Sequence, residues 1–180
     1  EDEAIMTENK KAILKDSNDV RLHPVWRSAE SCLSATQRAL RLAQRYGRRI
    51  HILHITTAEE LDLLRMHKDI ASAELLVNHL TLSAPECYER LGTRAQQNPP
   101  VREKHHQDAL WAAIADGTAD ILATDHAPHT LEEKAKPYPN SPSGMPGVQT
   151  LVPVMLTHVH QGRLTLERFV DLTASGPLRL

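Results

Sequence analysis

The stretch Ile121–Lys134, which reads ILATDHAPHTLEEK, determines how the rest of the chain is interpreted. An apolar run of strand length, residues 121–124, ends abruptly in Asp125, His126 and, further on, His129. Carboxylate and imidazole groups that converge lose hydration, so they usually need a metal, a substrate or a counter-charge. By itself the stretch fits two interpretations equally well: a ligand site at the end of a strand, or a solvated turn.

Two further segments, residues 49–55 and residues 71–76, have the character of strands. Cap residues and apolar positions at a spacing of three to four predict helices over residues 28–46, 57–66, 107–115, 151–161 and 165–174. His23 is expected to be extended, because Pro24 follows it. Strands that alternate with helices predict βα units and a parallel sheet.

The composition excludes several classes of function. Aromatic residues make up 3% of the 180 residues and the net charge is −2, which argues against a nucleic-acid partner. No apolar run approaches the roughly 20 residues that cross a bilayer, so no membrane contact is expected. Cys32 and Cys87 are too few for a disulfide framework, and a reducing cytoplasmic location is the simplest expectation. The chain opens at Glu1 without an initiator methionine, so we expect a piece of a larger protein.

Candidate functional residues lie at the ends of the predicted strands, where parallel α/β folds gather their functional groups. His54, the segment Glu74–His79 and Asp125 all lie at or near such ends. His51 stands three residues before His54, and side chains alternate along a strand, so only one of these histidines is expected to face a shared pocket. We choose His54 and expect His51 to be packed. Histidine and aspartate suit zinc, manganese or iron, but a catalytic metal needs at least three ligands.

The stretch Asp125–Lys134 resembles the signature of dihydroorotases, in the cyclic-amidohydrolase branch of the amidohydrolase superfamily. Four other stretches resemble motifs of this family in the same order along the chain. They are HPVWRSAE at 23–30, HILHITT at 51–57, NPPVR at 98–102 and GMPGVQT at 144–150. Together the matches cover essentially the whole chain.

The resemblance implies an α/β fold, a partial (β/α)8 TIM-type barrel of the metal-dependent amidohydrolase kind. Residues 1–180 would form the C-terminal part of a single barrel domain. The implied reaction on a small-molecule substrate is the reversible hydrolysis of L-dihydroorotate to N-carbamoyl-L-aspartate, a step of pyrimidine biosynthesis. Two zinc ions are implied for each complete site, and a bound metal lowers the pKa of water toward about 7.

The resemblance also implies roles for individual residues. His54 matches one metal ligand, and Asp125 matches another that also acts as the general base. The positions that match substrate contacts are Asn98, His129, Ser143 and Gly144. His126 receives no role from the resemblance.

Several parts of the family pattern have no counterpart in this chain. The HxHxR motif and the lysine or aspartate that bridges the metals are missing, and the histidine of the HxED motif would stand just before Glu1. The EVTPHHL motif is replaced by ELLVNHL at 74–80. We therefore expect the chain alone to form no binuclear site and to be inactive. We also expect it to need the remaining half of the barrel or self-association into a homo-oligomer.

Two alternative functions stay open. A hydantoinase or allantoinase would use the same metal ligands, and a non-catalytic relative could serve as a scaffold in a multienzyme complex. Arg102 is expected to form a salt bridge in its loop, and Glu132–Glu133 to form a solvated turn. The other histidines expected at the surface or in packing are His79, His105, His106, His158 and His160.

Overall fold

Three short strands form the centre of the fold. The computed structural model describes residues 1–15 and 17–180, and its strands are β1 (Ile50–Ile52), β2 (Ala71–Leu76) and β3 (Ile121–Ala123). They pair in parallel in the order β1-β2-β3. The predicted parallel sheet is therefore confirmed, and the carboxyl ends of its strands lie along one edge.

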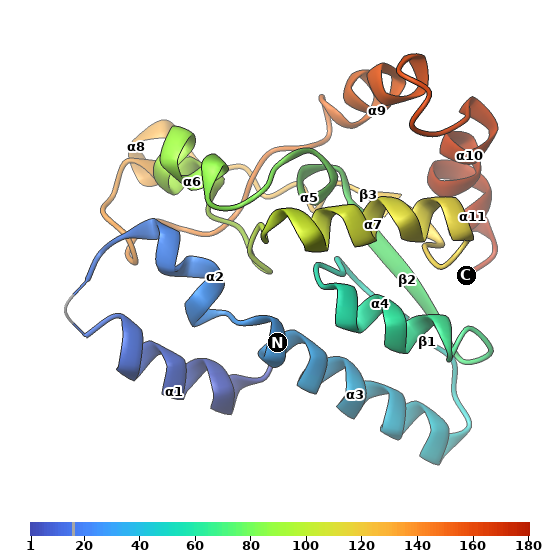
Figure 1. Cartoon of the computed structure of the whole chain (residues 1–180), viewed down its shortest axis with the longest axis horizontal. Coiled ribbons are helices and arrows are strands. Elements are labelled where there is room, and N and C mark those ends of the chain that lie inside the picture. Colours follow the sequence, from blue (N-terminus) through green and yellow to red (C-terminus); the bar gives the residue numbers. More distant parts are fainter. Residues whose placement is uncertain (16) are drawn as a thin grey trace.

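Helices connect and cover these strands. Their bounds are α1 (Glu3–Ile13), η1 (Val20–Leu22), α2 (His23–Trp26), α3 (Ala29–Tyr46), α4 (Ala58–Arg65), α5 (Val77–Thr81), α6 (Glu86–Leu91), η2 (Gly92–Ala95), α7 (Lys104–Asp116), α8 (Leu131–Lys134), α9 (Leu151–His160), α10 (Leu166–Val170), the π-helical η3 (Asp171–Ser175) and α11 (Gly176–Leu178). Figure 1 shows α3, α4 and α7 side by side in front of the strands, and α4 packs against both of the others. The segment from α9 to α11 lies at one side, where η3 packs against β3.

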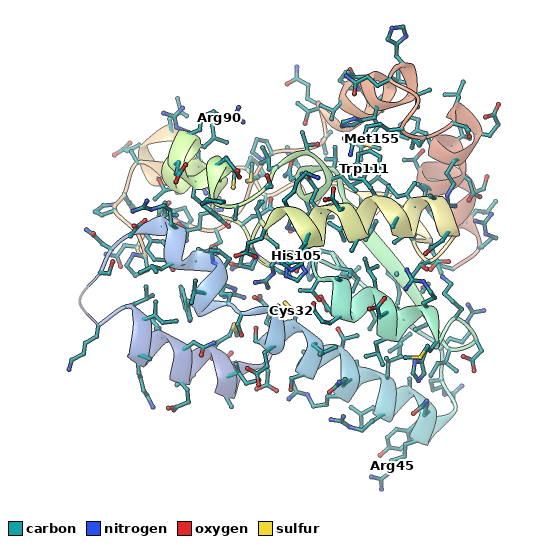
Figure 2. The ribbon with its side chains drawn as sticks, in the orientation of Figure 1. Cys32, Arg45, Arg90, His105, Trp111 and Met155 are labelled. Atoms are coloured by element: carbon teal, nitrogen blue, oxygen red, sulfur yellow. The ribbon has the colours of Figure 1, made fainter. Side chains whose placement is uncertain are left out.

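The long helix α3 begins and ends at the residues that its sequence predicts. The side chain of Ser28 accepts a hydrogen bond from the amide of Ser31 and so caps the N-terminus. Gly47 ends the helix in the left-handed conformation at φ 59°. Cys32 and Leu40 lie on the buried face of the helix, while Figure 2 shows Arg45 near its exposed end.

One large apolar core joins the sheet to the helices. Leu75 from β2, Leu110 from α7 and Leu172 from η3 are all buried in it. Figure 2 shows two further members of this core, Trp111 and Met155, between α7 and α9. A second cluster contains Ala84, Cys87, Tyr88, Ala95 and Val101. Each fully buried large apolar side chain contributes about 1.5–3 kcal/mol, so these contacts between distant segments hold the layers together.

Two local predictions are wrong. His23 is not extended: its φ of −58° and ψ of −47° are helical, and it begins α2. Pro24 is tolerated at the next position because the first turn of a helix does not use its N–H groups. Glu132–Glu133 lies in the short helix α8, where Glu133 and Thr130 form a capping box. None of the described helices is long and apolar enough to cross a membrane.

Candidate active site

His54 stands beyond the end of β1 in an unusual backbone conformation. It is the second residue after Ile52, and its φ is 40°, a left-handed value that non-glycine residues seldom adopt. Its amide donates a hydrogen bond to Oε1 of Glu74 in β2 over 3.3 Å. His54 also borders a cavity of about 270 Å³. The neighbouring strand thus fixes the backbone from which this side chain extends.

Asp125 repeats this arrangement at the end of β3. It is the second residue after Ala123, and its φ is 46°. Within residues 1–15 and 17–180, His54 and Asp125 are the two non-glycine residues with positive φ. Strain of this kind costs about 1–3 kcal/mol and clusters at functional sites. Since β1 and β3 both run parallel to β2, the two residues lie on the same edge of the sheet.

His51 and His54 both border the cavity of about 270 Å³, but so do Ile52 and Leu53 between them, so the choice of His54 over His51 stays a prediction. The alternation of side chains along a strand does not apply to His54, because β1 ends at Ile52 and the chain turns there. His51 is nevertheless packed as expected. Its Nδ1 lies 2.8 Å from Oγ of Ser72, and its Nε2 lies 3.6 Å from Oε2 of Glu74.

His126 holds the loop that follows the signature stretch. Its Nδ1 accepts hydrogen bonds from the amides of Gly147 (3.1 Å) and Val148 (3.3 Å). A neutral imidazole that accepts at Nδ1 carries its proton on Nε2. His126 also pairs with Met145 in an isolated parallel bridge. Its contacts therefore tie the end of β3 to residues 145–148.

His129 and Gly144 approach each other closely. Nε2 of His129 donates to the carbonyl oxygen of Ser143 over 3.2 Å. Gly144 has a φ of 148°, and a Cβ at this position would lie 2.6 Å from the carbonyl oxygen of Ala127 and 3.0 Å from Nε2 of His129. Only glycine therefore allows the loop to pack against the signature stretch.

The polar groups of Ser143 and Gly144 already have partners inside the chain. Oγ of Ser143 accepts from Nε2 of Gln96 over 3.1 Å, and the amide of Gly144 donates to the carbonyl oxygen of Gln96 over 2.9 Å. The carbonyl oxygen of Gly144 accepts from Nζ of Lys134 over 3.1 Å. A carbonyl oxygen has two lone pairs, so the carbonyl oxygens of Ser143 and Gly144 can each accept one further hydrogen bond from a ligand.

Asn98 is held by a buried histidine. Nε2 of His23 donates to Oδ1 of Asn98 over 3.1 Å and to the carbonyl oxygen of Gln97 over 3.0 Å. Burial lowers the pKa of His23 to about 4, so its ring is neutral at pH 7. Because Asn98 uses its oxygen in this contact, its amide nitrogen is the group left to donate to a ligand.

Three further residues near the site make contacts that the sequence does not predict. Arg102 forms no salt bridge among the described residues: it donates to the carbonyl oxygens of Pro24 (3.1 Å) and Arg27 (2.7 Å). The expected ion pair is therefore wrong, since backbone acceptors at the end of α2 take its place. The sequence places Glu74 only near a strand end and indicates nothing for Lys134, because neither a carboxylate within a strand nor the last lysine of a polar stretch reveals its partners.

The other histidines fit the expectation of packing or surface positions. His79 and His106 are buried, and His105 and His160 are exposed. Nε2 of His79 lies 3.0 Å from the carbonyl oxygen of Pro99, and burial lowers the pKa of His79 to about 3. The rings of His79 and His106 are therefore packed inside the protein, while those of His105 and His160 lie at the surface.

The donors at this edge do not complete a metal site by themselves. Imidazole and carboxylate are ligands that zinc accepts, so His54 and Asp125 fit in kind, but a catalytic zinc has three protein ligands. Among residues 1–15 and 17–180, no group of three or more His, Cys, Asp or Glu side chains is placed to hold a metal ion. A metal here would require donors that these residues do not supply.

Comparisons with known proteins find relatives of this chain in both sequence and fold. No family model matches the chain. The chain is 39% identical over 163 residues to the dihydroorotase of Halobacterium salinarum. The aligned region covers 91% of the chain and 38% of that relative. The structure of the chain resembles that of L-hydantoinase (dihydropyrimidinase) from Arthrobacter aurescens. The TM-score is 0.90 and the identity 28%, over 99% of the chain and 41% of the hydantoinase.

A third comparison concerns the fold alone. The inactive dihydroorotase-like domain of the Chaetomium thermophilum CAD-like multifunctional protein matches with a TM-score of 0.62 and 22% identity, over 84% of the chain and 41% of that protein. In each of these comparisons the chain spans less than half of the other protein. The fold thus defines the class: the chain has the fold of part of a TIM-type barrel of the amidohydrolase kind.

Within that class, the sequence resembles the dihydroorotases over most of the chain. Both the predicted partial (β/α)8 fold and the predicted resemblance are therefore confirmed.

Proposed function

We propose that the protein containing this chain is a dihydroorotase. It would be a metal-dependent hydrolase that interconverts L-dihydroorotate and N-carbamoyl-L-aspartate in pyrimidine biosynthesis. The observation that carries the proposal is the pair His54 and Asp125, which occupy equivalent strained positions at one edge of the parallel sheet. The 39% identity to a curated dihydroorotase supports the choice of substrate.

In this proposal Asp125 moves the proton of the reaction. Its carboxylate accepts a proton from the attacking water while oxygen bonds to the ring carbonyl carbon. It then delivers that proton to the amide nitrogen as the carbon–nitrogen bond breaks, so it acts first as base and then as acid. The strained backbone at Asp125 supports this role, because it directs the residue away from the regular path of β3.

The substrate contacts come from the two loops that meet at the site. Asn98 would donate from its amide nitrogen, since its oxygen is held by His23. His129 would donate from Nε2 to a polar substrate group and would exchange its present contact with Ser143 for that group. Ser143 and Gly144 would accept a ring N–H through the free lone pairs of their carbonyl oxygens.

The metal content is also a proposal. Two zinc ions in a complete site would take His54 and Asp125 as ligands, together with donors that the described residues do not supply. Residues 1–180 would then be the C-terminal part of one barrel domain, completed by the rest of the barrel or by a homo-oligomeric partner. The cytoplasm is the proposed location.

The experiment is a hydrolysis assay on the complete gene product with L-dihydroorotate, hydantoin and allantoin as substrates. We expect turnover of L-dihydroorotate at the highest kcat/KM, and a loss of about a hundredfold or more in Asp125→Asn, as for removal of a general acid–base group. Preference for hydantoin or allantoin would contradict the proposal, as would full activity of Asp125→Asn.

Two other candidates each have a specific observation in their favour. The structural similarity to an L-hydantoinase at a TM-score of 0.90 favours a hydantoinase, and the same substrate panel decides it. A non-catalytic scaffold is favoured by the incomplete donor set in the described residues. Metal-independent behaviour and no turnover of any substrate by the complete gene product would support the scaffold.

A further inference from the structure

Lys134, the last residue of the signature stretch, is almost completely buried, with 6% of its surface exposed. Lysine is rarely buried to this extent. Its Nζ donates to three carbonyl oxygens, those of Gln96 (2.9 Å), Pro142 (2.8 Å) and Gly144 (3.1 Å). Removing an ammonium group from water is costly, and these three bonds match its three N–H donors.

The three acceptors come from two segments that are distant in sequence. Gln96 lies two residues before Asn98, and Pro142 and Gly144 stand on either side of Ser143. The amide of Gly144 also donates to the carbonyl oxygen of Gln96 over 2.9 Å. Lys134 therefore cross-links the segment that carries Asn98 to the loop that carries Ser143 and Gly144.

We propose that Lys134 is a positioning residue for substrate binding, which holds the Asn98 segment and the 141–148 loop at the spacing that the substrate requires. The inference rests on the proposed function, which assigns substrate contacts to both segments. Lys134 acts through those contacts and does not touch the substrate. Burial lowers the pKa of Lys134 to about 8, which agrees with an ammonium group surrounded by neutral acceptors.

Removal of the ammonium group tests this role. In Lys134→Met the three carbonyl oxygens lose their donor, and the two segments lose their link. In the complete gene product, we expect the KM for L-dihydroorotate to rise about tenfold or more, which corresponds to about 1.4 kcal/mol, while kcat changes less than threefold. Lys136→Met is the matched control, because Lys136 is exposed two residues further along the chain, and it should keep the KM of the unmodified protein.

A second measurement separates this inference from the proposed function. Hydrogen exchange of the backbone amides in residues 141–148 should be about tenfold or more faster in Lys134→Met, with exchange in α3 unchanged. If the unmodified protein hydrolyses no cyclic amide, the proposed function fails, and the exchange data still decide whether Lys134 links the two segments. If Lys134→Met does not fold, Lys134→Gln takes its place. A KM within twofold of the unmodified protein, or unchanged exchange in the loop, overturns the inference.

Discussion

The carboxylate of Glu74 accepts the backbone N–H of His54 over 3.3 Å, and this contact links β2 to the strained end of β1. The other oxygen of the same carboxylate lies 3.6 Å from Nε2 of His51. One acid therefore contacts both histidines of the cavity. A backbone at φ 40° persists only where surrounding contacts compensate its cost, and Glu74 supplies such a contact.

The first prediction concerns this contact. Glu74→Ala should lower the free energy of unfolding by about 1–3 kcal/mol, because the amide of His54 loses a charged acceptor. Glu74→Gln should lose less, since its amide oxygen can still accept. Urea unfolding measures both variants. Glu132→Ala, an exposed residue, is the control and should stay within about 0.5 kcal/mol of the unmodified protein. Equal stability of Glu74→Ala and Glu132→Ala contradicts the prediction.

The second prediction concerns the close approach at Gly144. Gly144→Ala places a Cβ 2.6 Å from the carbonyl oxygen of Ala127, so the loop and His129 must move apart. Gly47→Ala is the matched control, because its φ of 59° is also left-handed but nothing lies within 4 Å of the added Cβ. The control should cost about 1 kcal/mol in unfolding free energy, and Gly144→Ala about 1–3 kcal/mol more. A cost equal to that of the control would mean that the packing at Gly144 is not tight.

The third prediction concerns acid. The pKa of His23 is lowered by burial from 6.5 to about 4, so between these values the unfolded chain binds more protons than the folded one. The contribution of neutral His23 to the free energy of unfolding is therefore fully present above about pH 6.5. It is lost as the pH falls toward 4. From about pH 8 to about pH 5 the free energy of unfolding should fall by on the order of 2 kcal/mol from this residue.

Urea unfolding at the two pH values measures this effect, and two histidine variants isolate it. His23→Gln should remove the contribution of this ring, while His160→Gln, at an exposed position, should keep the full pH dependence. Buried His79, with a pKa lowered to about 3, also reduces the free energy of unfolding as the pH falls, and it does so equally in both variants. The assignment to His23 fails if His23→Gln and His160→Gln show the same slope of stability against pH.

The fourth prediction concerns metal. The 180-residue chain alone should bind less than one zinc per chain at micromolar free zinc and should not hydrolyse L-dihydroorotate, because two donors leave a zinc site open. Elemental analysis after dialysis and a turnover assay measure these properties. His54→Ala is the comparison, and it should leave the low zinc content unchanged. Stoichiometric zinc with turnover in the isolated chain would show that its own residues complete the site.

Much of the fold follows from local sequence. The helix over residues 28–46 and the strand over residues 71–76 were predicted within a residue or so, because cap residues and apolar periodicity act over a few positions. His23 departs from its prediction because tertiary burial outweighs the local preference that Pro24 imposes. Arg102 departs because its acceptors are backbone oxygens, which no side-chain pattern reveals.

The candidate site was predicted less completely. The positions of His54 and Asp125 at strand ends follow from the sequence, and their roles as metal ligands stay predictions. The links made by Glu74, His126 and Lys134 were not predictable, since they join residues separated by 8 to 38 positions in the sequence. Such contacts depend on how the loops fold back on the sheet, and one chain offers no pattern for them.

The sequence by itself determined the order of strands and helices, the class of barrel and the two strand-end residues, because these depend on short-range periodicity and on recognisable motifs. Only the tertiary structure decided that both residues share the same strained backbone conformation, that Gly144 must be glycine and that a buried lysine joins two loops. The physical reason is that strain, close packing and burial of charge arise between segments, after each segment has already formed.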